Sequence, residues 1–149
     1  MGKASAYGTS TGTVWVNGVR SKMDNKKAIG FVPQEDVMLR TMTVEEILTH
    51  SAWLRLPRSF SVKQINTIVS TVIQMLGLEN SRHSLIGDEE KRGISGGQRK
   101  RVNIGMELVA LPSLLCLDVS KTCSQLCSLL IFLSQHQQTG TNKWIGCFH

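Results

Sequence analysis

The chain has 149 residues, of which 41% are hydrophobic and 19% charged, and its formal net charge is +6. This length is enough for one domain with a hydrophobic core, and the composition excludes a disordered chain. The basic residues fall into short clusters with no aromatic run between them, so we expect no nucleic-acid partner.

The first 34 residues predict two strand regions. The stretch "GTVWVNG" (12–18) alternates as a strand does and ends in Asn17–Gly18, a strong turn signal. The stretch "AIGFVPQ" (28–34) is a short apolar run closed by Pro33. It predicts a buried strand that leads into a loop.

Three capping boxes predict three helices, over residues 44–56, 62–76 and 96–110. In a capping box, a Ser or Thr and the Glu or Gln three residues later each satisfy a free backbone N–H at a helix start. The pairs are Thr43/Glu46, Ser61/Gln64 and Ser95/Gln98. Gly77 stands where the second helix would need a C-cap, and Pro112 ends the third.

The stretch "PSLLCLD" (112–118) follows the third helix and predicts another buried strand, which ends at Asp118. Strands therefore alternate with helices, and the predicted fold class is α/β.

The start of the third helix has an unusual composition. Gly96 and Gly97 directly follow Ser95, although glycine is a poor helix former. Glycines at a helix N-terminus let backbone N–H groups approach an anion closely, and the helix dipole favours negative charge there. The pattern favours an anion site, and the alternative is an ordinary capped helix with a solvated basic face.

Four stretches together resemble the ATP-binding domain of ABC transporters, most closely the G, or white-type, subfamily. They are "GFVPQEDVM", "TVEEIL", "EKRGISGGQRKRVNIGMELV" and "PSLLCLD", and the resemblance covers residues 12–118. It implies a partial P-loop NTPase-type fold, in which a mixed sheet carries a helical subdomain, at about 43–110, with the signature motif. Residues 1–118 would then form a partial ATP-binding domain.

The resemblance also implies roles for individual residues. The signature residues of the family touch the γ-phosphate of an ATP that is held mainly by the opposite subunit. In this chain they are Ser95, Gly96, Gly97 and Gln98.

Two more residues have roles by resemblance. Gln34 matches the glutamine loop, which contacts magnesium and water and reports the nucleotide state to the membrane domain. Asp118 matches the Walker B aspartate, which holds Mg²⁺ through water.

Other family features have no counterpart in the sequence. No stretch fits the phosphate loop G-x-x-x-x-G-K-[ST], so Met1 would be an internal methionine of a longer ancestor. Val119 stands where the family has its catalytic glutamate, and a valine cannot accept a proton. His149 lies near the expected place of the switch histidine, but "GTNKWIGCF" (140–148) does not resemble the apolar strand that should carry it.

Residues 119–149 differ from the rest of the chain, because all 11 acidic residues lie in 1–118. We expect this segment to be an aberrant tail that does not match the family. A frameshift, a retained intron or an error in the gene model would explain it, and an evolved degenerate domain is the rival account.

The predicted function is that of a fragment of an ABC transporter ATP-binding subunit. Its family binds and hydrolyses ATP with Mg²⁺ to move lipids or other small molecules across membranes. We expect this chain to be inactive alone and to bind ATP weakly or not at all. The alternative is a non-catalytic interaction protein that supplies the signature motif in trans.

The resemblance implies two partners, a second ATP-binding domain and the transmembrane domain of a transporter. It also implies a place on the cytosolic side of a membrane. The longest apolar run, "LCSLLIFL" (126–133), is too short to span a bilayer, and no signal peptide is visible, so a cytoplasmic location is the alternative.

Overall fold

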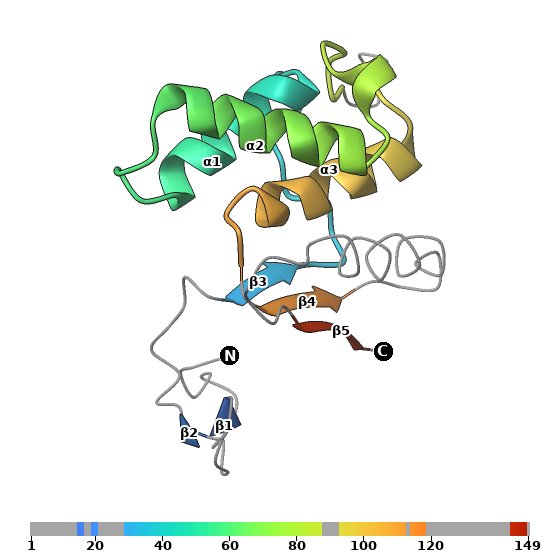
Figure 1. The fold of residues 1–149 in the computed structure, drawn as a ribbon. Coiled ribbons are helices and arrows are strands. Elements are labelled where there is room, and N and C mark those ends of the chain that lie inside the picture. Colours follow the sequence, from blue (N-terminus) through green and yellow to red (C-terminus); the bar gives the residue numbers. More distant parts are fainter. Residues whose placement is uncertain are drawn as a thin grey trace.

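The computed structural model describes residues 15–16, 19–20, 29–87, 93–112, 114–118 and 144–148. Three parallel strands form the larger sheet, in the order β3 (Ile29–Val32), β4 (Leu114–Asp118) and β5 (Trp144–Phe148). Val32 pairs with Leu117, and Asp118 pairs with Phe148. The carboxyl ends of the three strands therefore lie at one edge of the sheet (Figure 1).

The strand predictions for the first 118 residues are confirmed. The "AIGFVPQ" and "PSLLCLD" stretches form β3 and β4, but β3 is not buried throughout, because Gly30 and Val32 are buried and Phe31 is exposed. β1 (Trp15–Val16) and β2 (Val19–Arg20) form an antiparallel pair, in which Val16 faces Val19. The turn residues between them lie outside the described part of the chain.

The stretch before His149 does not resemble the apolar strand of the family, yet it contains a strand. Residues Trp144–Phe148 form β5, which pairs in parallel with β4 along its whole length. The polar Thr-Asn-Lys stretch at 141–143 ends before the strand begins. Trp, Ile and Phe all favour the extended conformation, so "WIGCF" has a composition suited to a strand.

Three helices connect β3 to β4, as the capping boxes predict. They are α1 (Val44–Arg55), α2 (Val62–Met75) and α3 (Gly96–Leu108), with a short 3₁₀ helix, η2 (Glu79–Ser81), after α2. Both hydrogen bonds of each predicted capping box are present. Each helix ends one or two residues earlier than the sequence pattern predicts.

The end of α2 confirms the role predicted for Gly77. This glycine has a φ of +60°, the left-handed conformation that glycine adopts without strain. Its N–H donates to the carbonyl of Gln74, and the N–H of Leu78 donates to the carbonyl of Ile73. These two bonds are those of a Schellman motif, which satisfies the last carbonyls of a helix.

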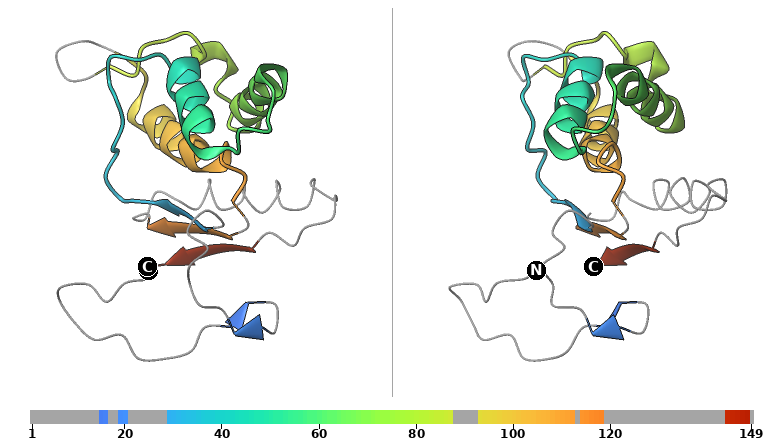
Figure 2. Two further views of the ribbon diagram at one scale, coloured as in Figure 1. Left: turned by 90° about the vertical axis from the view of Figure 1, so that its left-hand side faces the viewer. Right: turned by 60° about the vertical axis from the view of Figure 1, so that its left-hand side comes forward.

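The helices lie together on one side of the sheet, and α3 is the helix nearest to the strands (Figures 1 and 2). Their apolar faces form the core together with side chains of β3 and β4. The largest fully buried residues of this core are Leu48, Ile73, Leu76, Leu78, Ile86, Ile104, Leu117, Val32, Val44, Val69 and Val102. Burying each such side chain stabilises the fold by roughly 1.5–3 kcal/mol.

Within the described ranges, no helix combines the length and the apolar character needed to cross a bilayer.

Candidate functional site

The N-terminus of α3 is an exposed helix end with a complete cap. The Ser95 hydroxyl oxygen accepts from the backbone N–H of Gln98 at 3.3 Å, and the Gln98 side-chain oxygen accepts from the N–H of Ser95 at 2.9 Å. Ser95, Gly96 and Gly97 are all exposed. Among the described residues, no acceptor is found for the N–H groups of Gly96 and Gly97. Two aligned backbone donors therefore face outward beside the Ser95 hydroxyl.

The packing of the described residues does not explain why these two positions are glycine. Within the part of the chain that the structure describes, a Cβ atom built on Gly96 or Gly97 would meet no atom within 4 Å. By contrast, a Cβ on Gly93 would lie 2.2 Å from the carbonyl oxygen of Ile86, and one on Gly105 would lie 2.9 Å from Cδ2 of Leu48. Internal packing therefore constrains Gly93 and Gly105, whereas the described residues place no such constraint on Gly96 and Gly97.

Both polar atoms of the Gln98 side chain form hydrogen bonds within the chain. Its oxygen binds the N–H of Ser95, and its nitrogen donates to the hydroxyl of the buried Ser81 at 2.7 Å. This second bond ties the start of α3 to η2. The amide thus supports the cap and fixes the position of Ser95.

The basic run after the signature glycines also binds the chain itself. Lys100 contacts the loop after β3, and its ammonium group lies 2.6 Å from the carbonyl oxygen of Gln34. Arg101 donates to the carbonyl of Leu76 at 2.9 Å, where a positive charge complements the C-terminal end of α2. Two of the three bases therefore stabilise the fold, and the sequence pattern did not indicate this.

Gln34 and Asp118 lie at the same edge of the sheet. Gln34 comes two residues after the end of β3, Asp118 is the last residue of β4, and the two strands are parallel neighbours. The carboxyl edge of a parallel sheet is where open α/β folds bind ligands. The Gln34 side chain is exposed, and its backbone is held by α3. Val119 and His149 lie outside the described residues.

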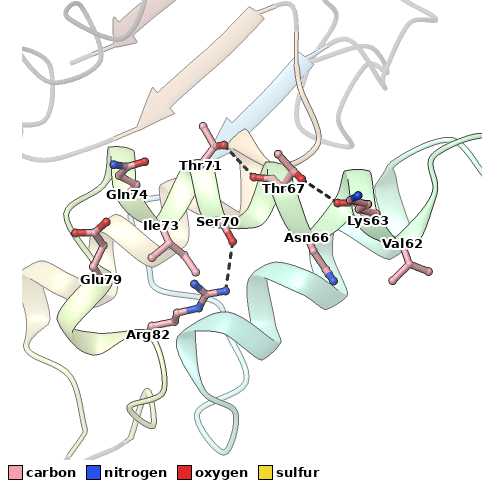
Figure 3. Close-up of a pocket in the computed structure, with 10 residues that line it drawn as sticks. All are labelled: Val62, Lys63, Asn66, Thr67, Ser70, Thr71, Ile73, Gln74, Glu79 and Arg82. Atoms are coloured by element: carbon pink, nitrogen blue, oxygen red, sulfur yellow. Dashed lines mark hydrogen bonds between the residues drawn. The ribbon is translucent and has the colours of Figure 1, made fainter.

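A shallow depression of about 870 Å³ lies elsewhere, along α2 and η2 (Figure 3). Its hydroxyl groups are used locally: Thr67 donates to the carbonyl of Lys63, and Thr71 donates to that of Thr67. Arg82 binds Glu45 at 2.5 Å and holds the pKa of that carboxyl below its usual value, against the opposing effect of burial. These contacts engage the hydroxyl groups of Thr67 and Thr71 within the chain.

The sequence profile described as "ABC transporter" matches residues 4–120, which include both candidate regions. The chain belongs to the ABC transporter family. It is 54% identical over 109 residues to ABC transporter G family member 28 of Arabidopsis thaliana, covering 72% of this chain and 10% of that protein. It is 44% identical over 112 residues to the rat "Broad substrate specificity ATP-binding cassette transporter ABCG2", covering 75% of this chain and 17% of that protein.

Solved structures agree on the ABC fold. The ATP-binding cassette MJ0796, in a dimeric post-hydrolysis state bound to ADP and Pi, gives a TM-score of 0.64 at 20% identity, covering 93% of this chain and 62% of that chain. The cbiO1 protein of Clostridium perfringens is part of the ABC transporter complex cbiONQ. It gives a TM-score of 0.69 at 19% identity, covering 93% of this chain and 55% of that chain. The chain is thus a partial α/β ABC ATPase domain whose curated relatives are G-family transporters.

Proposed function

We propose that this chain supplies the signature half of a composite ATP site, in trans to an ATP held by a second ATP-binding domain. The observation that carries the proposal is that Gly96 and Gly97 are exposed and that the packing of the described residues does not require glycine at either position. Glycine lowers helix stability, so a need outside the chain explains its presence here. A phosphate approaching the backbone closely is such a need.

Each signature residue has a distinct part in this proposal. The N–H groups of Gly96 and Gly97 and the Ser95 hydroxyl would contact oxygens of the γ-phosphate. Gln98 would act through Ser95, because both polar atoms of its side chain are already engaged. The capped helix end supplies the positive field.

The second region would serve the magnesium ion that accompanies ATP. Asp118 ends β4 and Gln34 follows β3 at the same sheet edge, so their side chains would supply oxygen atoms for the ion. Mg²⁺ binds through one or two carboxylates and keeps several waters, so this pair fits it. The bound ion would neutralise charge on the phosphates. Val119 offers no group for accepting a proton, so we do not assign hydrolysis to this chain.

The wider role follows from the family. The ABC transporter relatives, the dimeric MJ0796 structure and the cbiONQ complex support a second ATP-binding domain and a transporter's transmembrane domain as partners. In that setting the chain would work on the cytosolic side of a membrane and take part in ATP-driven transport of lipids or other small molecules.

The test is a pull-down of this chain by an intact G-family ATP-binding domain that binds but does not hydrolyse ATP. We expect ATP to increase capture of the wild-type chain and to have no effect on Ser95→Arg, whose large side chain would block the phosphate. Capture that depends neither on ATP nor on the Ser95 substitution would show adhesion through apolar surface and would refute the proposal.

A further inference from the structure

Lys100 has an unusual environment for a lysine within the "RKR" run. Its ammonium group donates to the carbonyl oxygens of Pro33 at 3.0 Å and Gln34 at 2.6 Å, and lies 3.4 Å from a carboxylate oxygen of Asp36. Its side chain is only 17% exposed. An ammonium has three donors, and here each faces an acceptor on the loop after β3.

The next turn of α3 adds a contact to the same loop. The buried Asn103 donates from its side-chain nitrogen to the carbonyl of Glu35 at 3.4 Å. Lys100 and Asn103 thus hold three consecutive carbonyl groups, those of residues 33, 34 and 35. We call this set of contacts the loop clamp.

The loop clamp lies on the same rigid helix as the signature residues. Ser95 caps α3, and Lys100 follows five residues later, which corresponds to about 7.5 Å along the helix axis. A displacement of the signature end must therefore move the ammonium group, and with it the backbone that carries Gln34.

We propose that Lys100 is a positioning residue that couples the signature helix to the glutamine loop of the same chain. The positioning rests on the contacts above, and the coupling to ATP also rests on the proposed function. Lysine suits this place because its compact ammonium spreads three donors over three acceptors. The planar guanidinium of arginine favours paired acceptors instead.

Arg101 offers a matched control. It neighbours Lys100 on α3, carries the same charge and also donates to a backbone carbonyl, but its acceptor is Leu76 at the end of α2. Lys100→Met and Arg101→Met therefore remove equivalent groups that hold different segments.

Native-state cleavage by a glutamyl endopeptidase distinguishes the two segments. Glu35 lies in the clamped loop, and Glu79 lies just beyond the segment held by Arg101; both are exposed. Because cleavage follows local opening, loss of bonds from a charged donor should accelerate it about tenfold or more. We expect Lys100→Met to raise the initial rate after Glu35 relative to Glu79, and Arg101→Met to lower this ratio.

The ratio of the two rates decides the positioning role. A merely structural lysine would raise both rates together, and an unchanged ratio in Lys100→Met overturns the proposal. If circular dichroism shows that Lys100→Met is unfolded, Asn103→Ala is used to test the loop clamp instead. We expect it to raise the ratio of the cleavage rates after Glu35 and Glu79 about threefold. An unchanged ratio in a folded Asn103→Ala then overturns the proposal.

A second arm tests the coupling. With the hydrolysis-deficient partner present, ATP should slow cleavage after Glu35 in the wild-type chain but not in Lys100→Met, although ATP still promotes capture of both. Slowing in both chains would overturn the coupling. Failure of ATP to promote capture of the wild type would refute the proposed function, while the cleavage ratio of the isolated chain would still decide the role of Lys100.

Discussion

A carboxylate oxygen of Glu107 on α3 accepts a hydrogen bond from the backbone N–H of Phe31 on β3, at 3.1 Å. Both oxygens of Glu107 also bind the guanidinium of Arg55 on α1, at 2.6 and 2.7 Å. Gly30 allows this approach, since a Cβ there would lie 3.1 Å from the same carboxylate. One side chain therefore joins the sheet to two helices.

This junction should contribute to stability. We expect Glu107→Ala to lower the free energy of unfolding by about 2 kcal/mol, because it removes a bidentate ion pair and leaves a strand N–H without its acceptor. Urea denaturation followed by circular dichroism measures the change. Glu79→Ala, which removes an exposed carboxylate, is the control and should change the stability by less than about 0.5 kcal/mol. Equal effects of the two substitutions would contradict the role of Glu107.

The capping box of α1 should make the stability of the fold depend on pH. The Glu46 carboxylate accepts a hydrogen bond from the backbone N–H of Thr43, and this bond lowers the pKa of the carboxyl below its usual value of 4.5. A hydrogen bond with the Thr43 side chain lowers this pKa further. The stabilisation is therefore complete above about pH 4.5 and is lost as the pH falls below it. We expect the stability difference between wild type and Glu46→Gln to shrink between pH 6 and pH 3. A difference independent of pH would contradict this assignment.

Two glycine substitutions should have opposite effects on stability. Gly93→Ala places a Cβ 2.2 Å from the Ile86 carbonyl oxygen, and we expect a loss of about 2 kcal/mol or more. Gly97→Ala meets no atom of the described residues within 4 Å, and should stabilise the isolated chain by about 0.5–1 kcal/mol, through better helix propensity. Thermal or urea unfolding measures both. A clear loss of stability in Gly97→Ala would mean that the fold itself needs this glycine.

Local signals predicted most of the secondary structure. The capping boxes, Gly77 and the apolar runs each act within a few residues, so the helices, β3 and β4 follow from the sequence. The capping box and the glycine pair indicated an anion site at Ser95, whereas only the family resemblance indicated roles for Gln34 and Asp118.

Local sequence signals could not predict the long-range contacts. Lys100 reaches Gln34 across 66 positions, and Glu107 reaches Phe31 across 76. Nothing in "QRKR" distinguishes the lysine that holds a loop from the arginine beside it. The formation of β5 depends on its pairing with β4 in the assembled sheet, which local sequence signals do not report.

The isolated chain should bind Mg-ATP weakly or not at all. Its sequence contains no stretch of the form G-x-x-x-x-G-K-[ST], whose backbone and lysine cradle the phosphates in this family. Equilibrium dialysis with labelled ATP measures the affinity. Binding near a micromolar would need about 8 kcal/mol of favourable free energy and would show that the chain holds a complete nucleotide site of its own.

ATP-dependent capture of Gly97→Ala by the hydrolysis-deficient partner tests the central claim most directly. If an outside phosphate explains the glycine, the added methyl group should abolish the ATP-dependent part of the capture while the chain becomes no less stable. Gly93→Ala cannot replace it, because that substitution disturbs the fold. Undiminished ATP-dependent capture of a stably folded Gly97→Ala would contradict the account.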